Sequence, residues 1–195
     1  MRSHLTLGAV LAIGPLAIAG NDPDPSPGKR FQREVVGKKS LVGTVAGAGI
    51  QQARDSPYEW GPGWSGFGKR LASTFGKTLV TSGIQVTVGT ILHEELTYRP
   101  SGKKGFRPRL KYALLRTVIV PKTTTGEKTF SAGEVSGAVG GGFISRVWQP
   151  ARLHTFASGA GSAGIALGVD AGFNVAREFW PEIRHPKQAR ARQTH

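Results

Sequence analysis

The chain contains no cysteine, which excludes disulfide bonds and thiol chemistry. At 195 residues it is long enough to bury a sizeable core without such cross-links. It also lacks an uninterrupted apolar run of about 18 residues, the length typical of a membrane-spanning helix. Acidic residues are scarce as well: 12 Asp and Glu stand against 26 Lys and Arg, for a net charge of +14.

The beginning of the chain has the pattern of a secretory signal over residues 1–20. Arg2 supplies the positive charge, residues 5–18 are largely apolar, and residues 17–19 read Ala-Ile-Ala, like a cleavage site. An uncleaved anchor is the alternative. A linker rich in Pro and Asp follows over residues 21–31. We therefore expect export to the periplasm or outer envelope, a single domain over residues 32–183, and a basic, disordered tail over residues 184–195.

The excess of positive charge predicts a polyanionic partner. Because we expect export, a membrane surface or an anionic envelope polymer fits better than nucleic acid. The four tryptophans, Trp60, Trp64, Trp148 and Trp180, stand at the ends of apolar segments, as they do at membrane interfaces. Several of these segments carry charges, however, which are costly at mid-bilayer, so spanning a membrane is less favoured than peripheral association or a free state.

Glycine is abundant, and small residues recur at every fourth position in two ladders. The ladders are Gly133, Gly137, Gly141 and Ser145, and Gly164, Gly168, Gly172 and Ala176. A four-residue step keeps such positions on one helix face, where another backbone can approach closely. Each ladder therefore predicts a face for helix packing or for self-association into a homo-oligomer.

Apolar periodicity predicts helices over residues 32–56, 67–95, 107–120, 130–148 and 155–180. Residues 84–92 are rich in β-branched side chains and also fit a strand. In the third helix we expect Leu114 to point inward, and Arg109 and Arg116 outward. The predicted fold class is mainly α, a compact bundle of about four to five glycine-rich helices; a transmembrane β-barrel is the alternative.

Motifs for cofactors are incomplete. Two Gly-x-Gly-x-x-Gly matches, at residues 61–66 and 159–164, lack the surrounding βαβ unit. His93-Glu94 begins like a zinc-binding helix, but Thr97 stands where the second histidine ligand is needed. We expect no cofactor and no metal site.

One polar constellation stands out in otherwise apolar surroundings. Buried carboxylates are tolerated only when paired, so we expect Arg99 or Arg177 to bind a carboxylate across two helices. An ion-pair lock is the favoured interpretation, and a ligand or acid–base site is the alternative. The residues are His93, Glu94, Glu95, Tyr98, Arg99, Asp170, Asn174, Arg177 and Glu178.

Three segments carry a family resemblance: residues 93–99 (HEELTYR), residues 141–150 (GGFISRVWQP) and residues 170–183 (DAGFNVAREFWPEI). Over residues 64–185 the chain resembles a group of bacterial exported proteins with a His-acid-x-x-Tyr element and a C-terminal Glu-Phe-Trp-Pro element. The resemblance implies a helical envelope protein and supplies no catalytic residues.

The sequence thus favours an envelope-associated helical protein with a structural or interaction role. An envelope hydrolase or ligand-binding protein that uses the polar constellation is the alternative.

Overall fold

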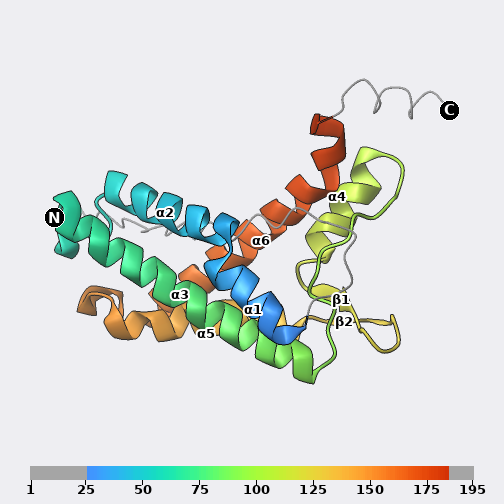
Figure 1. Ribbon diagram of the computed structural model, residues 1–195, viewed down its shortest axis with the longest axis horizontal. Coiled ribbons are helices and arrows are strands. Elements are labelled where there is room, and N and C mark those ends of the chain that lie inside the picture. The colour runs from blue at the N-terminus through green and yellow to red at the C-terminus, as the bar shows by residue number, and fades with distance from the viewer. Residues whose placement is uncertain (1–25, 185–195) are drawn as a thin grey trace.

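The computed structural model describes residues 26–184 (Figure 1). The predicted signal segment, nearly half of the predicted linker and all but the first residue of the predicted tail lie outside the described residues. The described chain is mainly helical, as predicted. Its elements are α1 (Pro27–Val36), α2 (Lys38–Ala53), η1 (Tyr58–Trp60), α3 (Gly63–Ile91), α4 (Phe106–Leu115), β1 (Ile119–Pro121), β2 (Lys128–Phe130), α5 (Ala132–Ile144), η2 (Ser145–Trp148), η3 (Ala151–Leu153) and α6 (Phe156–Arg184).

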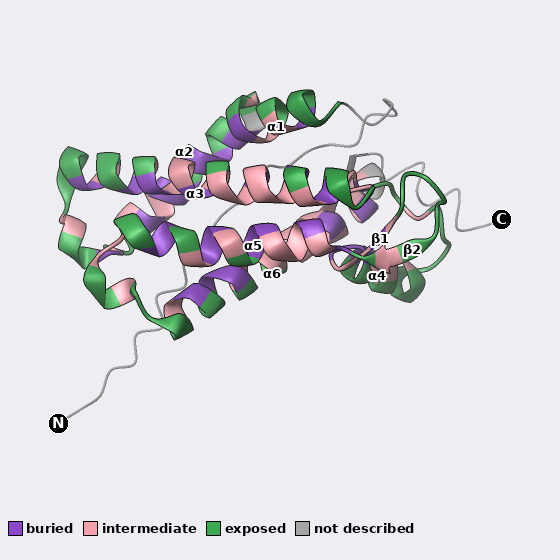
Figure 2. Cartoon of the chain, turned by 90° about the horizontal axis from the view of Figure 1, so that it is seen from below, coloured by how far each residue is buried: buried purple, intermediate pink, exposed green. Residues whose placement is uncertain are grey.

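Helix α3 lies at the centre of the arrangement. Helices α1 and α2 pack on one side of it and α5 packs on the other, while α6 packs on the far side of α5 (Figure 2). The C-terminal half of α6 extends beyond this stack and packs against α4, next to the β1–β2 hairpin (Figure 1). The molecule therefore has one end built from α4 and the hairpin, and an opposite end built from η1, η2 and η3.

The segment that also fitted a strand, residues 84–92, is helical through Ile91. Val86 and Gly89 on it are buried, and α3 packs against α5 along this stretch. Packing against a neighbouring helix outweighs the modest strand preference of β-branched residues. Within residues 26–184, none of the helices combines the length and the apolar character needed to cross a membrane.

The helix predicted over residues 32–56 is two helices, and the first begins earlier than expected. Helix α1 starts at Pro27, inside the predicted linker, because proline is well suited to the first turn of a helix. The break falls at Gly37, whose backbone is extended (ψ 145°). A side chain on Gly37 would collide with the carbonyl oxygen of Arg33, so glycine is required at this turn.

The helix predicted over residues 107–120 ends at Leu115, and a short hairpin follows in place of the predicted polar turn. Strand β1 pairs antiparallel with β2, with Val120 opposite Thr129. The predicted orientation of three side chains was wrong: Leu114 is exposed, whereas Arg116 is buried and Arg109 is largely buried. Arg116 donates to the carbonyl oxygens of Glu95 and Thr97, at 2.7 and 3.1 Å, which explains its burial.

The first small-residue ladder lies on the face of α5 that packs against α3. A Cβ atom on Gly133 would lie 3.1 Å from the Cα of Gly89, and one on Gly137 would lie 2.9 Å from the carbonyl oxygen of Thr81. A Cβ on Gly141 would come closer still and overlap the hydroxyl oxygen of Thr81, and Ser145 is fully buried. Close approach of the two backbones therefore depends on the absence of side chains here.

The second ladder does not lie at a helix contact. Gly164, Gly168 and Gly172 are exposed, with open space where a Cβ would stand, and Ala176 is half-buried. Instead, α6 meets α5 through Gly159 and Ala163: a Cβ on Gly142 would lie 2.8 Å from the Gly159 carbonyl oxygen. The contacting positions precede the ladder positions by one residue, which is about 100° of rotation around the helix. The ladder face is therefore exposed, and its use in self-association stays a prediction.

Candidate functional site

The polar constellation divides into separate groups, and Glu178 is the centre of the first. Its carboxylate is 1% exposed and accepts hydrogen bonds from Tyr98 Oη (2.7 Å), from Ser101 N (2.9 Å) and from the Ser101 hydroxyl. Arg109 Nε forms an ion pair with it at 3.1 Å. Glu178 thus binds the loop before α4, and α4 itself, to α6; the arginine that pairs with it is Arg109, not Arg99 or Arg177.

The titration of this group reflects its partners. Burial alone would raise the pKa of Glu178, but the hydrogen bonds from Ser101, Tyr98 and Arg109 outweigh it and hold the pKa below its usual range. Burial and the neighbouring carboxylate raise the pKa of Tyr98. Glu178 is therefore ionised and fully paired, as in an ion-pair lock.

Glu94 caps the N-terminus of α5. Its carboxylate is 3% exposed and accepts from the backbone N–H groups of Ala132 (2.8 Å) and Gly133 (2.9 Å) and from the Ser131 hydroxyl (3.1 Å). These N–H groups lack partners within the helix, and the positive end of the helix dipole favours a carboxylate. Glu94 therefore fixes the start of α5 to the end of α3.

Three further members of the constellation lie at the surface or near it. His93 is exposed, and its backbone (φ 55°) is left-handed, so that its carbonyl accepts from Thr123 N at 2.7 Å. Arg99 and Glu95 pair with each other at 2.5 Å, and the Arg99 side chain is 64% exposed. Neither His93 nor the Arg99–Glu95 ion pair is bonded to the Glu178 carboxylate, so these side chains do not form one site.

Asp170 belongs to a group of buried charges between α1, α3, α5 and α6. Burial raises the pKa values of Asp170 and of Glu134, and the charge of Asp170 raises the latter further. Burial also raises the pKa of Glu34 to about 7, although Arg30 and Arg33 oppose this. Arg177 stabilises ionised Asp170, and donates to Asn174 Oδ1 at 3.3 Å.

The structure also contains a buried lysine–serine pair that the sequence did not reveal. Lys77 Nζ on α3 donates to Ser162 Oγ on α6 at 2.6 Å, and the two residues are 6% and 4% exposed. Lysine–serine pairs serve some hydrolases as base and nucleophile. Here the hydroxyl is enclosed between helices, so a substrate would have to separate them to reach it, and we assign no such role.

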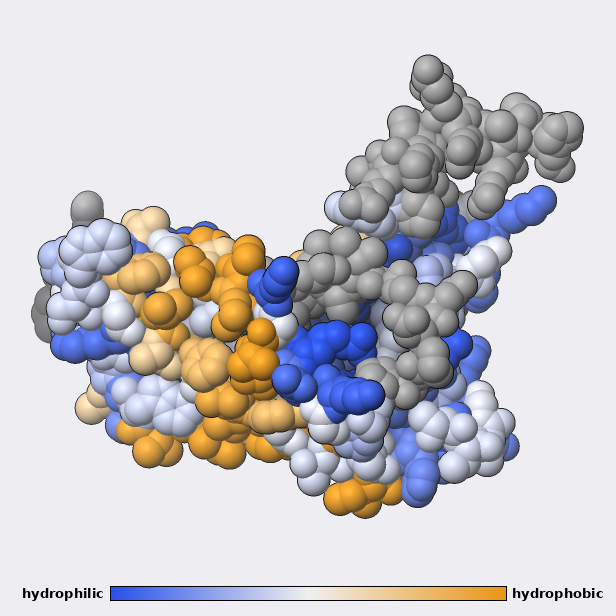
Figure 3. All heavy atoms as spheres, viewed as in Figure 1, coloured by the Kyte–Doolittle hydropathy of each residue, from blue (hydrophilic) through white to orange (hydrophobic). Residues whose placement is uncertain are grey.

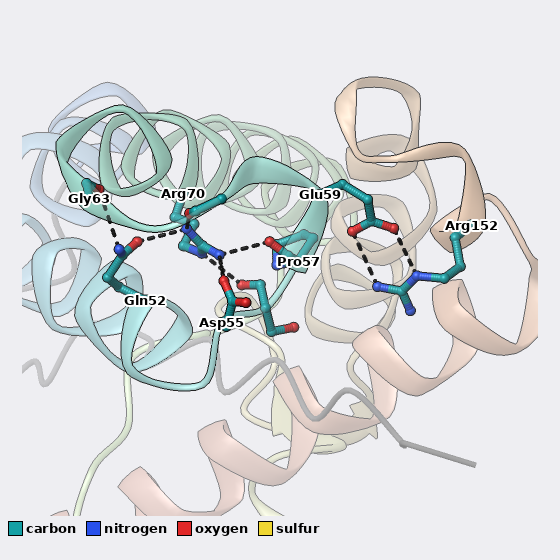
Figure 4. Close-up of polar contacts among 9 residues, drawn as sticks. Gln52, Asp55, Pro57, Glu59, Gly63, Arg70 and Arg152 are labelled. Carbon is teal, nitrogen blue, oxygen red and sulfur yellow. Dashed lines mark hydrogen bonds and ion pairs between the residues drawn. The ribbon is translucent and has the colours of Figure 1, made fainter. Parts of the chain in front are cut away.

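Arg70 organises the end of the molecule that contains η1 (Figure 4). It is fully buried, and its guanidinium donates to Gln52 Oε1 and to the Gly61 and Pro57 carbonyls, each at 2.7 Å. Asp55 pairs with it at 3.0 Å. At the same end Arg152 of η3 pairs with Glu59 at 2.8 Å (Figure 4). These contacts hold the connection between α2 and α3 in place.

The opposite end carries a basic surface, which we define by the exposed cations of α4, the preceding loop and the hairpin. Phe106 of α4 is 65% exposed, and Glu127 in the hairpin turn is an exposed acid. Figure 3 shows hydrophilic residues over this end and hydrophobic residues over the α2–α3 end. The cations are Arg99, Lys103, Lys104, Arg107, Lys111, Lys122 and Lys128.

The four tryptophans differ in their exposure. Trp64 is 88% exposed at the start of α3, whereas Trp148 packs across Gly76 and donates to Ser73 Oγ at 3.1 Å. Trp60 and Trp180 are half-buried.

Comparison with protein-family models, with curated proteins and with solved structures finds no match. Within the described chain, no group of three or more His, Cys, Asp and Glu residues could hold a metal ion.

Several residues at these sites were missed from the sequence. Glu134 carries a signal that could have been used: it is a lone carboxylate in a helix otherwise made of small and apolar residues. Lys77, Arg70 and Arg109 lack such a signal, because each looks like an ordinary charge on an amphipathic helix until its neighbours are known.

Proposed function

We propose that this protein is exported and associates peripherally with the cell envelope, where its basic surface binds anionic lipid head groups. The single observation that carries this proposal is the concentration of exposed Lys and Arg around α4, with Glu127 as an exposed counter-charge there. Basic residues close to an anionic membrane each contribute about 1 kcal/mol to binding. An anionic envelope polymer is the alternative ligand of the same surface.

An exposed aromatic side chain on this surface supports a lipid ligand. Phe106 is 65% exposed, and its ring centroid lies 5.3 Å from that of Phe179, so one side of the ring packs against α6. An exposed aromatic ring among cations is typical of surfaces that enter the head-group region. Leu115, 47% exposed at the end of α4, adds apolar area nearby.

The buried contacts of Glu178 also support the proposal, because they order the segments that carry the surface cations. They hold Ser101, Tyr98 and Arg109 in place, and these residues lie beside the cations of the loop and of α4. A surface that is already ordered loses less conformational entropy when it binds. The resemblance to exported envelope proteins agrees with this location.

The alternative is a hydrolase or ligand-binding site that uses His93, Glu94, Tyr98, Asp170 and Glu178. Tyr98 donates to Glu178, but the other side chains lie in separate groups, so the geometry favours it less. Glu94 caps α5, Glu178 is paired with Arg109, and His93 is exposed.

Self-association is a second part of the proposal. The α6 face that carries Gly164, Gly168 and Gly172 is exposed, and Val42 on α2 is 69% exposed. Sedimentation equilibrium of the protein without vesicles tests this: the proposal expects species larger than the monomer, and monomers at all concentrations would contradict it.

Co-sedimentation with lipid vesicles tests the main proposal. We expect binding to vesicles that contain phosphatidylglycerol, no binding to phosphatidylcholine alone, and release as salt is raised. The double variant Lys103→Glu with Lys104→Glu should bind roughly 30-fold more weakly or worse, at about 1 kcal/mol per lost cation.

The matched control reverses two exposed charges on other elements, Lys38 of α2 and Lys69 of α3. It has the same net charge as the first double variant and should bind better. Equal loss in both variants would show that only the net charge matters, and equal binding to both vesicle types would contradict an electrostatic surface. Binding to soluble polyphosphate without binding to vesicles would assign the surface to a polymer.

A further inference from the structure

Two buried cations form no ion pair with a carboxylate among the described residues. Arg146 of η2 is 7% exposed and Lys77 of α3 is 6% exposed. This feature is separate from the basic surface and from the Glu178 contacts.

Both side chains point to the same crossing of α5 and α6. Arg146 Nε donates to the Gly142 carbonyl at 2.9 Å, and a Cβ on Gly142 would lie 3.0 Å from the backbone nitrogen of Ala163. Ser162, the neighbour of Ala163, accepts from Lys77 Nζ at 2.6 Å. Both cations therefore lie at the crossing of α5 and α6, where Lys77 contacts Ser162 directly.

Both cations have N–H donors left over after their hydrogen bonds to the protein are counted. Arg146 Nη2 is buried and has no hydrogen-bond partner within residues 26–184. The ammonium of Lys77 has three donors, and Ser162 takes one of them. Burial and the charge of Arg146 together lower the pKa of Lys77 to about 8, so the two cations repel each other. Asp170 is the acid that acts on Lys77, but its own pKa is raised by burial.

Unpaired buried charge is strongly unfavourable, and a charged partner removes most of the penalty. We propose that Lys77, Arg146 and Ser162 form an internal site for a small inorganic anion, with chloride as the probe. The ion would accept hydrogen bonds from Arg146 Nη2, from Lys77 Nζ and from the Ser162 hydroxyl. Such a site would hold α3, η2 and α6 together.

Thermal unfolding of the full chain at constant ionic strength tests the proposal, with sodium chloride compared with sodium gluconate, whose anion is too large for an enclosed site. We expect the melting temperature to be higher in chloride by roughly 3 °C or more, since a ligand of the folded state alone stabilises it. Lys77→Met should abolish this difference, and in gluconate it should be at least as stable as the wild type because the repulsion is gone. The matched control is Lys69→Met, an exposed lysine on the same helix, which should keep the difference.

Equal melting temperatures of the wild type in the two salts would overturn the proposal, as would an unchanged chloride effect in Lys77→Met. If that variant does not fold, chloride-35 line broadening by the wild type supplies a second measurement. Saturable broadening that persists in the basic-surface variant Lys103→Glu with Lys104→Glu supports the internal site; broadening that this variant loses, or none at all, contradicts it. The lipid-binding proposal can fail without affecting these results.

Discussion

At the residue scale, the buried carboxylates of this protein have opposite effects on stability. Glu178 is ionised and surrounded by donors, and its pKa is lowered. Glu34 and Glu134 lie where burial dominates, and their pKa values are raised. Glu178 therefore stabilises the folded state when it is charged, whereas Glu34 and Glu134 stabilise it when they are protonated.

Replacing Glu178 with Gln should destabilise the protein by about 3 kcal/mol, because it removes the buried charge that pairs with Arg109 and accepts hydrogen bonds from Tyr98 and Ser101. Urea unfolding measures this change. Since the folded pKa is depressed, the contribution of Glu178 is present above its unfolded pKa of about 4.5 and is lost as the pH falls below it. The variant should therefore lose less stability than the wild type on acidification.

Glu95→Gln is the matched control for this variant. It removes an ion pair whose arginine is 64% exposed, and exposed pairs contribute about 0.5 kcal/mol. A loss of similar size in both variants would contradict the assignment of Glu178 as the lock.

Replacing Glu134 with Gln should stabilise the protein at alkaline pH. A raised carboxyl pKa means that the folded state binds more protons than the unfolded state, so stability falls as the pH rises from about 4.5 to about 7 and above. The variant should flatten this fall, measured by urea unfolding at pH 5 and pH 8. The exposed Glu127→Gln should follow the wild type; a variant that is less stable than the wild type at pH 8 would contradict the account.

At the scale of the helices and strands, the sequence predicted the long helices but not all of their ends or faces. Apolar periodicity identified the stretches that became α3, α5 and α6. The break at Gly37 depends on a single steric contact with Arg33, and the three-residue strands of the hairpin carry too little pattern to be recognised. The i, i+4 spacing was equally clear in both ladders, so it could not show which one is covered.

Alanine substitutions in the two ladders should therefore act in opposite directions. Gly137→Ala places a Cβ 2.9 Å from the carbonyl oxygen of Thr81 and should destabilise the protein by about 1–3 kcal/mol. Gly168→Ala meets open space and should stabilise it by roughly 0.5–1 kcal/mol, because alanine is the better helix former. Urea unfolding of the two variants provides the comparison. Destabilisation by Gly168→Ala would reveal a contact that this account lacks.

At the scale of the whole molecule, the charge was visible in the sequence but its distribution was not. The net charge of +14 predicted an anionic partner, whereas the gathering of cations at one end depends on how α4 packs against α6. The polar constellation was predicted as one group of residues, but it is divided into several groups for the same reason. Glu94 and Glu178 lie in segments far apart in the chain, and their partners, Ser131 and Arg109, come from still other segments.

The central claim is peripheral attachment of an exported protein to an anionic membrane surface. The most direct measurement is to express the full chain in bacteria, isolate the membranes, and wash them first with high salt and then with carbonate. The account predicts that the protein is found with the membranes and is released by salt, because screening weakens attraction between exposed charges. Retention until detergent is added, or absence from the membranes before any wash, would contradict it.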